Sequence, residues 1–238
     1  MNIKVSVVGA SGRMGKLALE LIDAAQDLSL HSALDSKSNL AETSGADVIF
    51  DVTRLEVSAQ VVQHALASGT AVVVGTSGWS SSKLAQLESG VSKVDGTVVV
   101  VPNFSVGSML ATRFAAEAAK HFSSIEIVEA HHAHKLDSPS GTAIRTAELI
   151  AQSRASTALV VGADQEARGQ IVAGVPVHSL RLSGVSAKQD VHLGGDSELL
   201  TISHETTSVY AYSAGILASI RFAAANKGLF VGLETVLA

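Results

Sequence analysis

The segment HHAHKLDSPSGT, residues 131–142, gathers most of the side chains that are suited to chemistry. A strand is predicted over 125–130, so these side chains emerge where a strand ends. If the chain stays extended there, His131 and Lys135 point to one side, and His132 and His134 to the other. One side would then carry a proton donor together with a fixed cation.

The end of the same segment predicts an anion site. Ser138 or Ser140 is a typical N-cap residue, and Gly141 and Thr142 open a helix predicted over 142–152. The N–H groups at a helix start attract an anion, and Lys135 is near enough in sequence to share it. This arrangement favours a small substrate that carries carboxylates.

Three other interpretations of these residues stay open. His132 and His134 have the one-apart spacing of some zinc ligands, although no matching set of ligands follows at motif spacing. The histidines could instead be structural, which is the usual role of a single histidine. Lys135 could be a solvated surface charge, although its place beside a helix start argues against this.

Three glycines near the N-terminus predict a dinucleotide site. Gly9, Gly12 and Gly15 lie between a predicted strand, 3–8, and a helix with one apolar face. Glycine there permits a tight turn, close approach of the backbone to a pyrophosphate, and close packing of helix on strand. Asp35 ends the next predicted strand about 20 residues on, as in dinucleotide-binding folds.

The coenzyme itself is left open by these residues. Asp35 suits the ribose hydroxyls of NAD and repels the 2′-phosphate of NADP. Arg13 and Lys37 lie close in sequence, where they could neutralise that phosphate or simply face solvent. NADH, NADPH or both therefore remain candidates. Two further strand-end loops, 75–78 and 101–104, could be plain turns or could contact the nicotinamide half, and their place at the same sheet edge as Gly9 favours the contact.

The order of predicted elements indicates an α/β fold. Apolar strands at 3–8, 28–34, 48–52, 71–74 and 98–101 alternate with helical patterns, which predicts a Rossmann-type, doubly wound parallel sheet. After a helix over 106–120, strands dominate to residue 202, with a loop over 155–174 and hairpin-type breaks at 183–184 and 194–195. This half predicts a second, α+β domain with a mixed or antiparallel sheet, followed by a helix over 215–225.

Composition excludes several classes of protein. The 238 residues include no cysteine, so disulfides, thiolate metal sites and thiol catalysis are absent. A net charge of −5 without basic clusters argues against a nucleic-acid partner. The charge-free stretches 65–82 and 96–112 are broken by Gly, Ser, Asn and Pro, so we expect no membrane span and a cytoplasmic protein. Charges are sparse, which suggests that a partner subunit covers some apolar surface.

Several motifs together resemble one family. They are GASGRMG, GTSGW, VPNFSVG, EAHHAHKLDSPSGTA, VPVHSLRLSG and GLETVL. The sequence is similar in these motifs to the 4-hydroxy-tetrahydrodipicolinate (dihydrodipicolinate) reductases of the bacterial diaminopimelate and lysine pathway. The long histidine motif is the most specific of them, and the resemblance spans nearly the whole chain.

The resemblance implies a reductase that transfers hydride from NADH or NADPH to a cyclic dicarboxylate, giving tetrahydrodipicolinate. It implies a homotetramer of two-domain subunits: a dinucleotide domain, 1–104, completed by a C-terminal helix at 215–238, and a substrate and oligomerisation domain, 105–214. Two rivals are another Rossmann-type reductase of small oxo or imino acids and a non-catalytic dinucleotide-sensing module.

The resemblance also assigns roles to residues of this chain. His131 would be the acid/base and Lys135 a second proton donor, with no metal ion. The residues implied to hold the substrate are His132, Ser140, Gly141 and Thr142. The residues implied to contact the coenzyme are Gly9, Ala10, Ser11, Gly12, Arg13, Met14, Asp35, Gly75, Thr76, Ser77, Val101, Pro102, Asn103 and Phe104.

Overall fold

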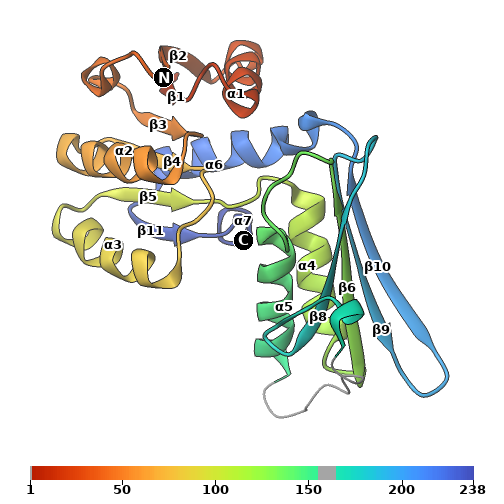
Figure 1. Ribbon diagram of the computed structural model, residues 1–238. Coiled ribbons are helices and arrows are strands. Elements are labelled where there is room, and N and C mark those ends of the chain that lie inside the picture. The colour runs from red at the N-terminus through yellow and green to blue at the C-terminus, as the bar shows by residue number, and fades with distance from the viewer. Residues whose placement is uncertain (1, 155–164) are drawn as a thin grey trace. The chain divides into compact units, whose positions relative to one another are not determined.

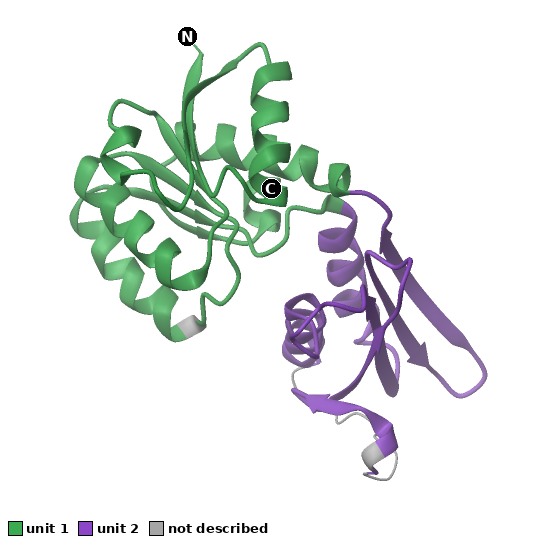
Figure 2. Ribbon diagram, turned by 45° about the horizontal axis from the view of Figure 1, so that its top comes forward, with its two compact units in different colours: residues 1–106, 209–238 green, residues 107–208 purple. Residues whose placement is uncertain are grey.

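The computed structural model describes residues 2–154 and 165–238 and divides the chain into two compact units (Figures 1 and 2). Unit 1 comprises residues 1–106 and 209–238, and unit 2 comprises residues 107–208. Unit 2 is therefore an insertion in the sequence of unit 1. Among the described residues, no helix combines the length and apolar content needed to cross a membrane.

Unit 1 alternates strands with helices, as its apolar runs predict. Its strands are β1 (Ile3–Val8), β2 (Leu28–Leu34), β3 (Val48–Asp51), β4 (Ala71–Val74), β5 (Thr97–Val100) and β11 (Gly228–Val231). Its helices are α1 (Arg13–Ala24), η1 (Leu40–Thr43), α2 (Leu55–Ser68), α3 (Ser81–Lys93), η3 (Val209–Tyr212), α6 (Ser213–Ala225) and α7 (Leu233–Val236).

The six strands of unit 1 form one parallel sheet in the order β11-β5-β4-β3-β1-β2. Helices α2 and α3 supply apolar side chains to one face, while α1 and α6 pack together on the other. Because both faces are covered, β3, β4 and β5 are buried along their whole length. The Rossmann-type prediction is confirmed, and the carboxyl ends of all six strands meet at one edge.

The sixth strand, β11, is absent from the sequence-based prediction, which gave the C-terminal segment a helix only. β11 has four residues, GLFV, and pairs in parallel with β5 at the edge of the sheet. A run this short cannot be told from loop or helix by periodicity alone. The pairing with Thr97–Val100, some 130 residues earlier in the chain, decides its conformation.

Unit 2 begins within α4 (Val106–Ala118) and is built around a second sheet. Its other elements are β6 (Ser124–His131), α5 (Gly141–Ser153), η2 (Glu166–Arg168), β7 (Gln170–Val172), β8 (Val175–Arg181), β9 (Ala187–Gly194) and β10 (Leu199–Thr206). The strand order is β10-β9-β6-β8-β7, with β6 and β8 parallel and the other pairs antiparallel. The mixed sheet predicted for this half of the chain is confirmed.

Helices α4 and α5 cover one face of this sheet (Figure 1). Ile125 and Ile127 of β6 point toward them into an apolar core that includes Ala147 and Ile150 of α5. The opposite face, which we call the outer face, carries no α-helix in the part of the chain that the structure describes. Residues of β6 therefore alternate between a dry core and the outer face.

Two expectations about unit 2 were wrong. Ser183 and Gly184 do not form a hairpin, because β8 and β9 flank β6 on opposite sides and do not pair with each other. The 155–174 loop contains η2 and β7 in its described part, while residues 155–164 lie outside the described residues. The break at Gly194 and Gly195 is a true hairpin, closed by the N–H of Gly195 on the carbonyl of Glu198.

The packing of α6 on unit 1 depends on Gly215. A Cβ built at this position would lie 2.0 Å from the carbonyl oxygen of Phe104, far inside contact distance. Gly90, in the middle of α3, has no heavy atom within 4 Å of its own virtual Cβ. The two glycines form a matched pair in which only the first is sterically required.

We predict that Gly215→Ala lowers the free energy of unfolding by roughly 1–3 kcal/mol, the usual cost of overpacking. Gly90→Ala should raise it by roughly 0.5–1 kcal/mol, because alanine is the better helix former. Urea denaturation followed by circular dichroism measures both. Equal midpoints for the two variants would contradict the close packing of α6.

Candidate active site

His131 is the last residue of β6, and the backbone turns immediately after it. The N–H of Lys135 donates to the carbonyl of His132 at 3.0 Å, which closes a turn over 132–135. The expected extended alternation of His131, His132, His134 and Lys135 is therefore wrong, because this turn takes the segment out of the strand. The position of Lys135 relative to His131 is set by the turn, not by strand geometry.

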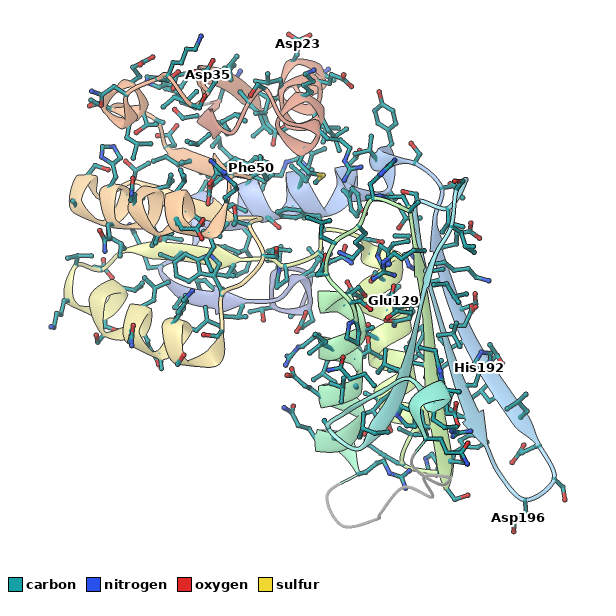
Figure 3. All side chains as sticks on the ribbon, in the orientation of Figure 1. Asp23, Asp35, Phe50, Glu129, His192 and Asp196 are labelled. Atoms are coloured by element: carbon teal, nitrogen blue, oxygen red, sulfur yellow. The ribbon has the colours of Figure 1, made fainter. Side chains whose placement is uncertain are left out.

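The neighbour of His131 in space is a carboxylate, Glu129, whose side chain is completely buried. It lies two residues earlier on β6, on the face covered by the helices (Figure 3). Its Oε2 accepts hydrogen bonds from Nδ1 of His131 at 2.5 Å and from Arg181 at 3.0 Å. Its Oε1 accepts from the other Arg181 nitrogen at 3.0 Å and from the N–H of Ser140 at 3.3 Å.

These donors decide the charge of Glu129. Burial alone would raise its pKa, but the hydrogen bonds from His131 and Arg181 outweigh burial and lower the pKa to about 2. Glu129 is therefore ionised at neutral pH, with donors from His131, Arg181 and Ser140 and the nearby Ser179 hydroxyl taking the place of water. An unpaired carboxylate at this depth would be strongly unfavourable.

Arg181, on β8, also holds the loop that carries Lys135. One of its nitrogens donates to the carbonyl of Asp137 at 2.6 Å. Nζ of Lys135 forms an ion pair with Oδ1 of Asp137 at 2.7 Å. Burial tends to raise the pKa of Asp137, and Lys135 outweighs it and lowers that pKa. Because the Asp137 carboxylate is mostly exposed, this ion pair is weak enough to exchange for a ligand.

Ser140 is the N-cap of α5, the second of the two serines that the sequence offers for this position. Its hydroxyl accepts from the N–H of Ala143 at 3.2 Å, and its own N–H donates to Glu129. The polar groups of Ser140 therefore shape the helix start instead of facing outward. Gly141 and Thr142 form the first turn, and Gly141 is exposed, with open space around its virtual Cβ. Their N–H groups and the helix dipole make this end attractive to a carboxylate.

Two other histidines belong to this segment. His132 is half-buried beyond the end of the strand, and His134 is exposed in the turn. Over residues 2–154 and 165–238, no group of three His, Asp or Glu side chains is placed to hold a metal ion.

The glycine turn follows the carboxyl end of β1 in unit 1. Gly9 has φ +91°, and a Cβ there would lie 2.7 Å from the carbonyl oxygen of Val52. A Cβ at Gly15 would lie 2.2 Å from the carbonyl oxygen of Gly9. These contacts leave no room for a side chain at either position, so the turn packs as dinucleotide-binding turns require.

The N–H groups of the turn fall into two sets. Those of Gly9 and Ala10 donate to the carbonyl of Leu34, at 3.0 and 2.9 Å, and so fix the turn to β2. Helix α1 begins at Arg13, and its first-turn N–H groups point out of the helix start. The N–H of Gly12 donates to the carbonyl of Gly9 at 3.0 Å, so the helix-start N–H groups that could attract an anion begin at Arg13 and Met14.

Asp35 follows β2 and is exposed (Figure 3). Its Oδ1 accepts from the N–H of Lys37 at 2.8 Å and from the hydroxyl of Ser38 at 3.2 Å. These two hydrogen bonds lower the pKa of Asp35. The carboxylate is thus fixed and charged beside the glycine turn, where a ribose would lie.

The two further loops, 75–78 and 101–104, combine buried and exposed residues. Gly75 lies against the ring of Phe104, because a Cβ there would be 2.6 Å from a ring carbon. Thr76, Val101 and Phe104 are buried, so these three residues shape the loops from within the fold and offer little surface to a ligand. Ser77 and Pro102 are exposed, and Asn103 is half-buried, with Oδ1 accepting the N–H of Ser105 at 2.9 Å.

A second buried carboxylate, Asp51, was missed by the sequence analysis. It ends β3 with no exposed surface, and burial raises its pKa despite hydrogen bonds from neighbouring hydroxyls. Oδ1 accepts from the hydroxyl of Thr53 at 2.6 Å, and Oδ2 from that of Thr76 at 3.3 Å. Asp51 therefore connects the end of β3 to the loop after β4.

Glu129 and Arg181 were likewise not assigned from sequence. One feature of the sequence does point to Glu129. Residues 125, 127 and 129 lie on the same face of the predicted strand, and Ile125 and Ile127 form part of the core, so an acidic residue at 129 must also be buried. Such a residue must find buried donors. Arg181 lies 52 residues away, and no local pattern indicates the pairing.

Comparison with known proteins assigns the whole chain. Residues 3–104 match the family model described as dihydrodipicolinate reductase, N-terminus, and residues 107–237 match dihydrodipicolinate reductase, C-terminus. A 4-hydroxy-tetrahydrodipicolinate reductase of Clavibacter michiganensis subsp. michiganensis is 51% identical over 240 residues, covering 100% of this chain and 87% of that protein. The enzyme of the same name from Streptomyces griseus subsp. griseus is 41% identical, covering 99% and 98%.

Solved structures agree with this assignment. A dipicolinate-bound dihydrodipicolinate reductase from Paenisporosarcina sp. TG-14 superposes with a TM-score of 0.84 at 31% identity, covering 98% of this chain and 99% of that one. An engineered D-amino acid dehydrogenase bound to NADP+ shares the fold alone, with a TM-score of 0.60 at 14% identity, covering 100% and 96%. This chain belongs to the dihydrodipicolinate reductase family.

Proposed function

We propose that this protein reduces 4-hydroxy-tetrahydrodipicolinate to tetrahydrodipicolinate with NADH or NADPH. The ring hydroxyl of the substrate leaves as water, and one hydride and one proton are added. The observation that carries the proposal is the cluster of His131, Glu129 and Arg181 beside the start of α5, in a chain with a complete dinucleotide turn. A dicarboxylate and a proton transfer suit this cluster.

The residues of unit 2 divide the work on the substrate. A carboxylate of the substrate binds the N–H groups of Gly141 and Thr142 at the start of α5. Lys135 exchanges its ion pair with Asp137 for the substrate and serves as a second donor. His131 supplies the proton from its Nε2, because its Nδ1 already faces Glu129. His132 contributes further polar contact to the substrate.

The residues of unit 1 hold the coenzyme, which when bound supplies the hydride. The start of α1 takes the pyrophosphate, and Asp35 takes the ribose hydroxyls. Asp35 is anionic and disfavours a 2′-phosphate, whereas Arg13 and Lys37 nearby in sequence favour it. We propose that the enzyme accepts both coenzymes, with Asp35 tilting the preference toward NADH.

We also propose that the chain forms a homotetramer through the outer face of unit 2. Glu126 on this face binds both His178, at 2.7 Å, and Arg168. Leu180, at the same strand parity as His178, is 44% exposed. An uncovered sheet with ordered polar side chains and an exposed leucine is well suited to pack on a second copy.

The reductase proposal is tested by following NADH and NADPH absorbance when substrate is formed in situ from pyruvate and aspartate semialdehyde. We predict that His131→Ala lowers kcat by roughly 100- to 10,000-fold, the usual value of general acid catalysis, with little change in KM for the coenzyme. His134→Ala, in the exposed part of the same segment, is the matched control and should keep its turnover. Full activity in His131→Ala would remove this residue from the chemistry, and an inactive wild type would favour a sensing module.

The coenzyme preference is predicted to depend on the charge of Asp35. Asp35→Asn keeps a side chain that can form the same turn but removes the negative charge. The variant loses the charge that repels a 2′-phosphate, so kcat/KM for NADPH relative to NADH should rise about two- to tenfold. Asp23→Asn, an exposed carboxylate on α1, should leave the ratio unchanged. An unaltered ratio in Asp35→Asn would place the 2′-phosphate elsewhere.

Light scattering after gel filtration tests the assembly. We expect the mass of four chains for the wild type and a smaller mass for Leu180→Glu, because a charge would be buried between subunits. Val94→Glu changes an exposed apolar residue of unit 1 and should keep the wild-type mass. If Leu180→Glu remains a tetramer, the interface does not lie on this face.

A further inference from the structure

We propose that Glu129 and Arg181 act as a positioning pair, which holds His131 in one tautomer and fixes it to the segments that bind the substrate. The proposal rests on the proposed function, since it assigns His131 the proton transfer, and extends it to two residues that make no contact with the reacting atoms. Glu129 is buried and faces the core side of β6, so its effect on the reaction passes through its neighbours.

The contact with Glu129 decides which ring nitrogen of His131 carries the hydrogen. An ionised carboxylate can only accept hydrogen bonds, so Nδ1 of His131 must carry the hydrogen in its 2.5 Å contact with Glu129. Nε2 is then the ring nitrogen that gains and loses a proton. The same logic operates wherever a carboxylate orients a catalytic or metal-binding histidine.

Glu129 also joins three segments of unit 2. The two oxygens of Glu129 receive donors from three segments: His131 on β6, Arg181 on β8 and the N–H of Ser140 at the start of α5. Arg181 extends the set by donating to the carbonyl of Asp137, next to the loop that carries Lys135. One buried carboxylate thus connects the acid/base residue, the anion-binding helix start and the lysine loop.

Arg181 is needed to keep Glu129 ionised. Without it, a fully buried carboxylate beside one imidazole would tend to take up a proton. The two parallel hydrogen bonds of the guanidinium, both 3.0 Å, keep Glu129 ionised and fix its plane. A lysine offers a single ammonium group and could not replace this planar fork.

A second trio in the same unit provides an internal comparison. On the outer face of β6, Glu126 binds Nε2 of His178 at 2.7 Å and also pairs with Arg168. It contains the same three residue types as the Glu129 cluster, but the opposite ring nitrogen faces the carboxylate. His178 should therefore carry its hydrogen on Nε2, and His131 on Nδ1.

Nitrogen-15 NMR of the imidazole rings in the full-length protein without ligands tests the tautomer directly. The spectrum is recorded at pH 9, and His131 is assigned by its disappearance in His131→Gln. We expect Nδ1–H for His131 and Nε2–H for His178 in the wild type. In Glu129→Gln the His131 signals should change to those of a tautomer mixture, while those of His178 stay fixed. An Nε2–H form of His131 in the wild type would overturn the inference.

Kinetics test the consequence for catalysis. Glu129→Gln should lower kcat by about 10- to 100-fold, as loss of an orienting partner usually does, and leave KM for the coenzyme unchanged because the dinucleotide turn lies in unit 1. Ile125→Val, in the core on the same strand and face, is the control for a mere loss of packing and should keep its kcat. A kcat of Glu129→Gln within twofold of the wild type would contradict the proposal.

A double variant separates loss of positioning from loss of the fold. Glu129→Gln leaves Arg181 without its partner, whereas Glu129→Leu combined with Arg181→Met removes both charges and keeps similar volumes. This double variant should fold, lose the Nδ1–H tautomer and show at least as large a fall in kcat. Retained turnover in the folded double variant would refute the positioning role. If the wild type itself fails to reduce the substrate, the proposed function falls, and the tautomer spectra still decide the role of Glu129.

Discussion

A buried carboxylate is stable only when hydrogen-bond donors replace the water it has lost, and this requirement organises unit 2. Glu129 obtains its donors from a side chain on its own strand, from the neighbouring strand and from the start of a helix. None of these segments can shift without leaving part of a charge unsatisfied, at a cost of several kcal/mol. The rigidity that a catalytic site needs thus follows from an electrostatic constraint in the core beneath it.

In unit 1, the loops at the strand ends are held mainly by close packing of the backbone rather than by a buried charge. Parallel strands place all their carboxyl ends at one edge, where the connecting loops must turn sharply without side chains in the way. Gly9, Gly15 and Gly75 each lie where a Cβ would collide with a carbonyl oxygen or a ring. Asp51 adds a buried carboxylate that ties two of these strand ends together. The positions of the loops are therefore set by close packing.

The sequence predicts what depends on local pattern and fails where distant pairing decides. The strands β1 to β5 are recognisable because burial on both faces makes them apolar runs, and the Ser140 cap follows from residue types at a helix start. The turn after His131 was not predicted, because polar residues at a strand end are compatible with extended and turned backbone alike. The partner of β8 was also not predicted, since a glycine indicates where a chain breaks but not which strand lies alongside.

The boundaries of the two units depend on contacts between residues far apart in the chain. The family models divide the chain once, between residues 104 and 107, whereas the compact units divide it twice, at 106/107 and again at 208/209. The family models do not mark the second division, which the resemblance placed at residue 215, because α6 and β11 belong to unit 1 through contacts with residues that precede the insertion. Gly215 on Phe104 and β11 on β5 are such contacts. Unit 2 is thus inserted between the two parts of a Rossmann sheet. The glycine turn and the Glu129 cluster therefore rest on separate cores.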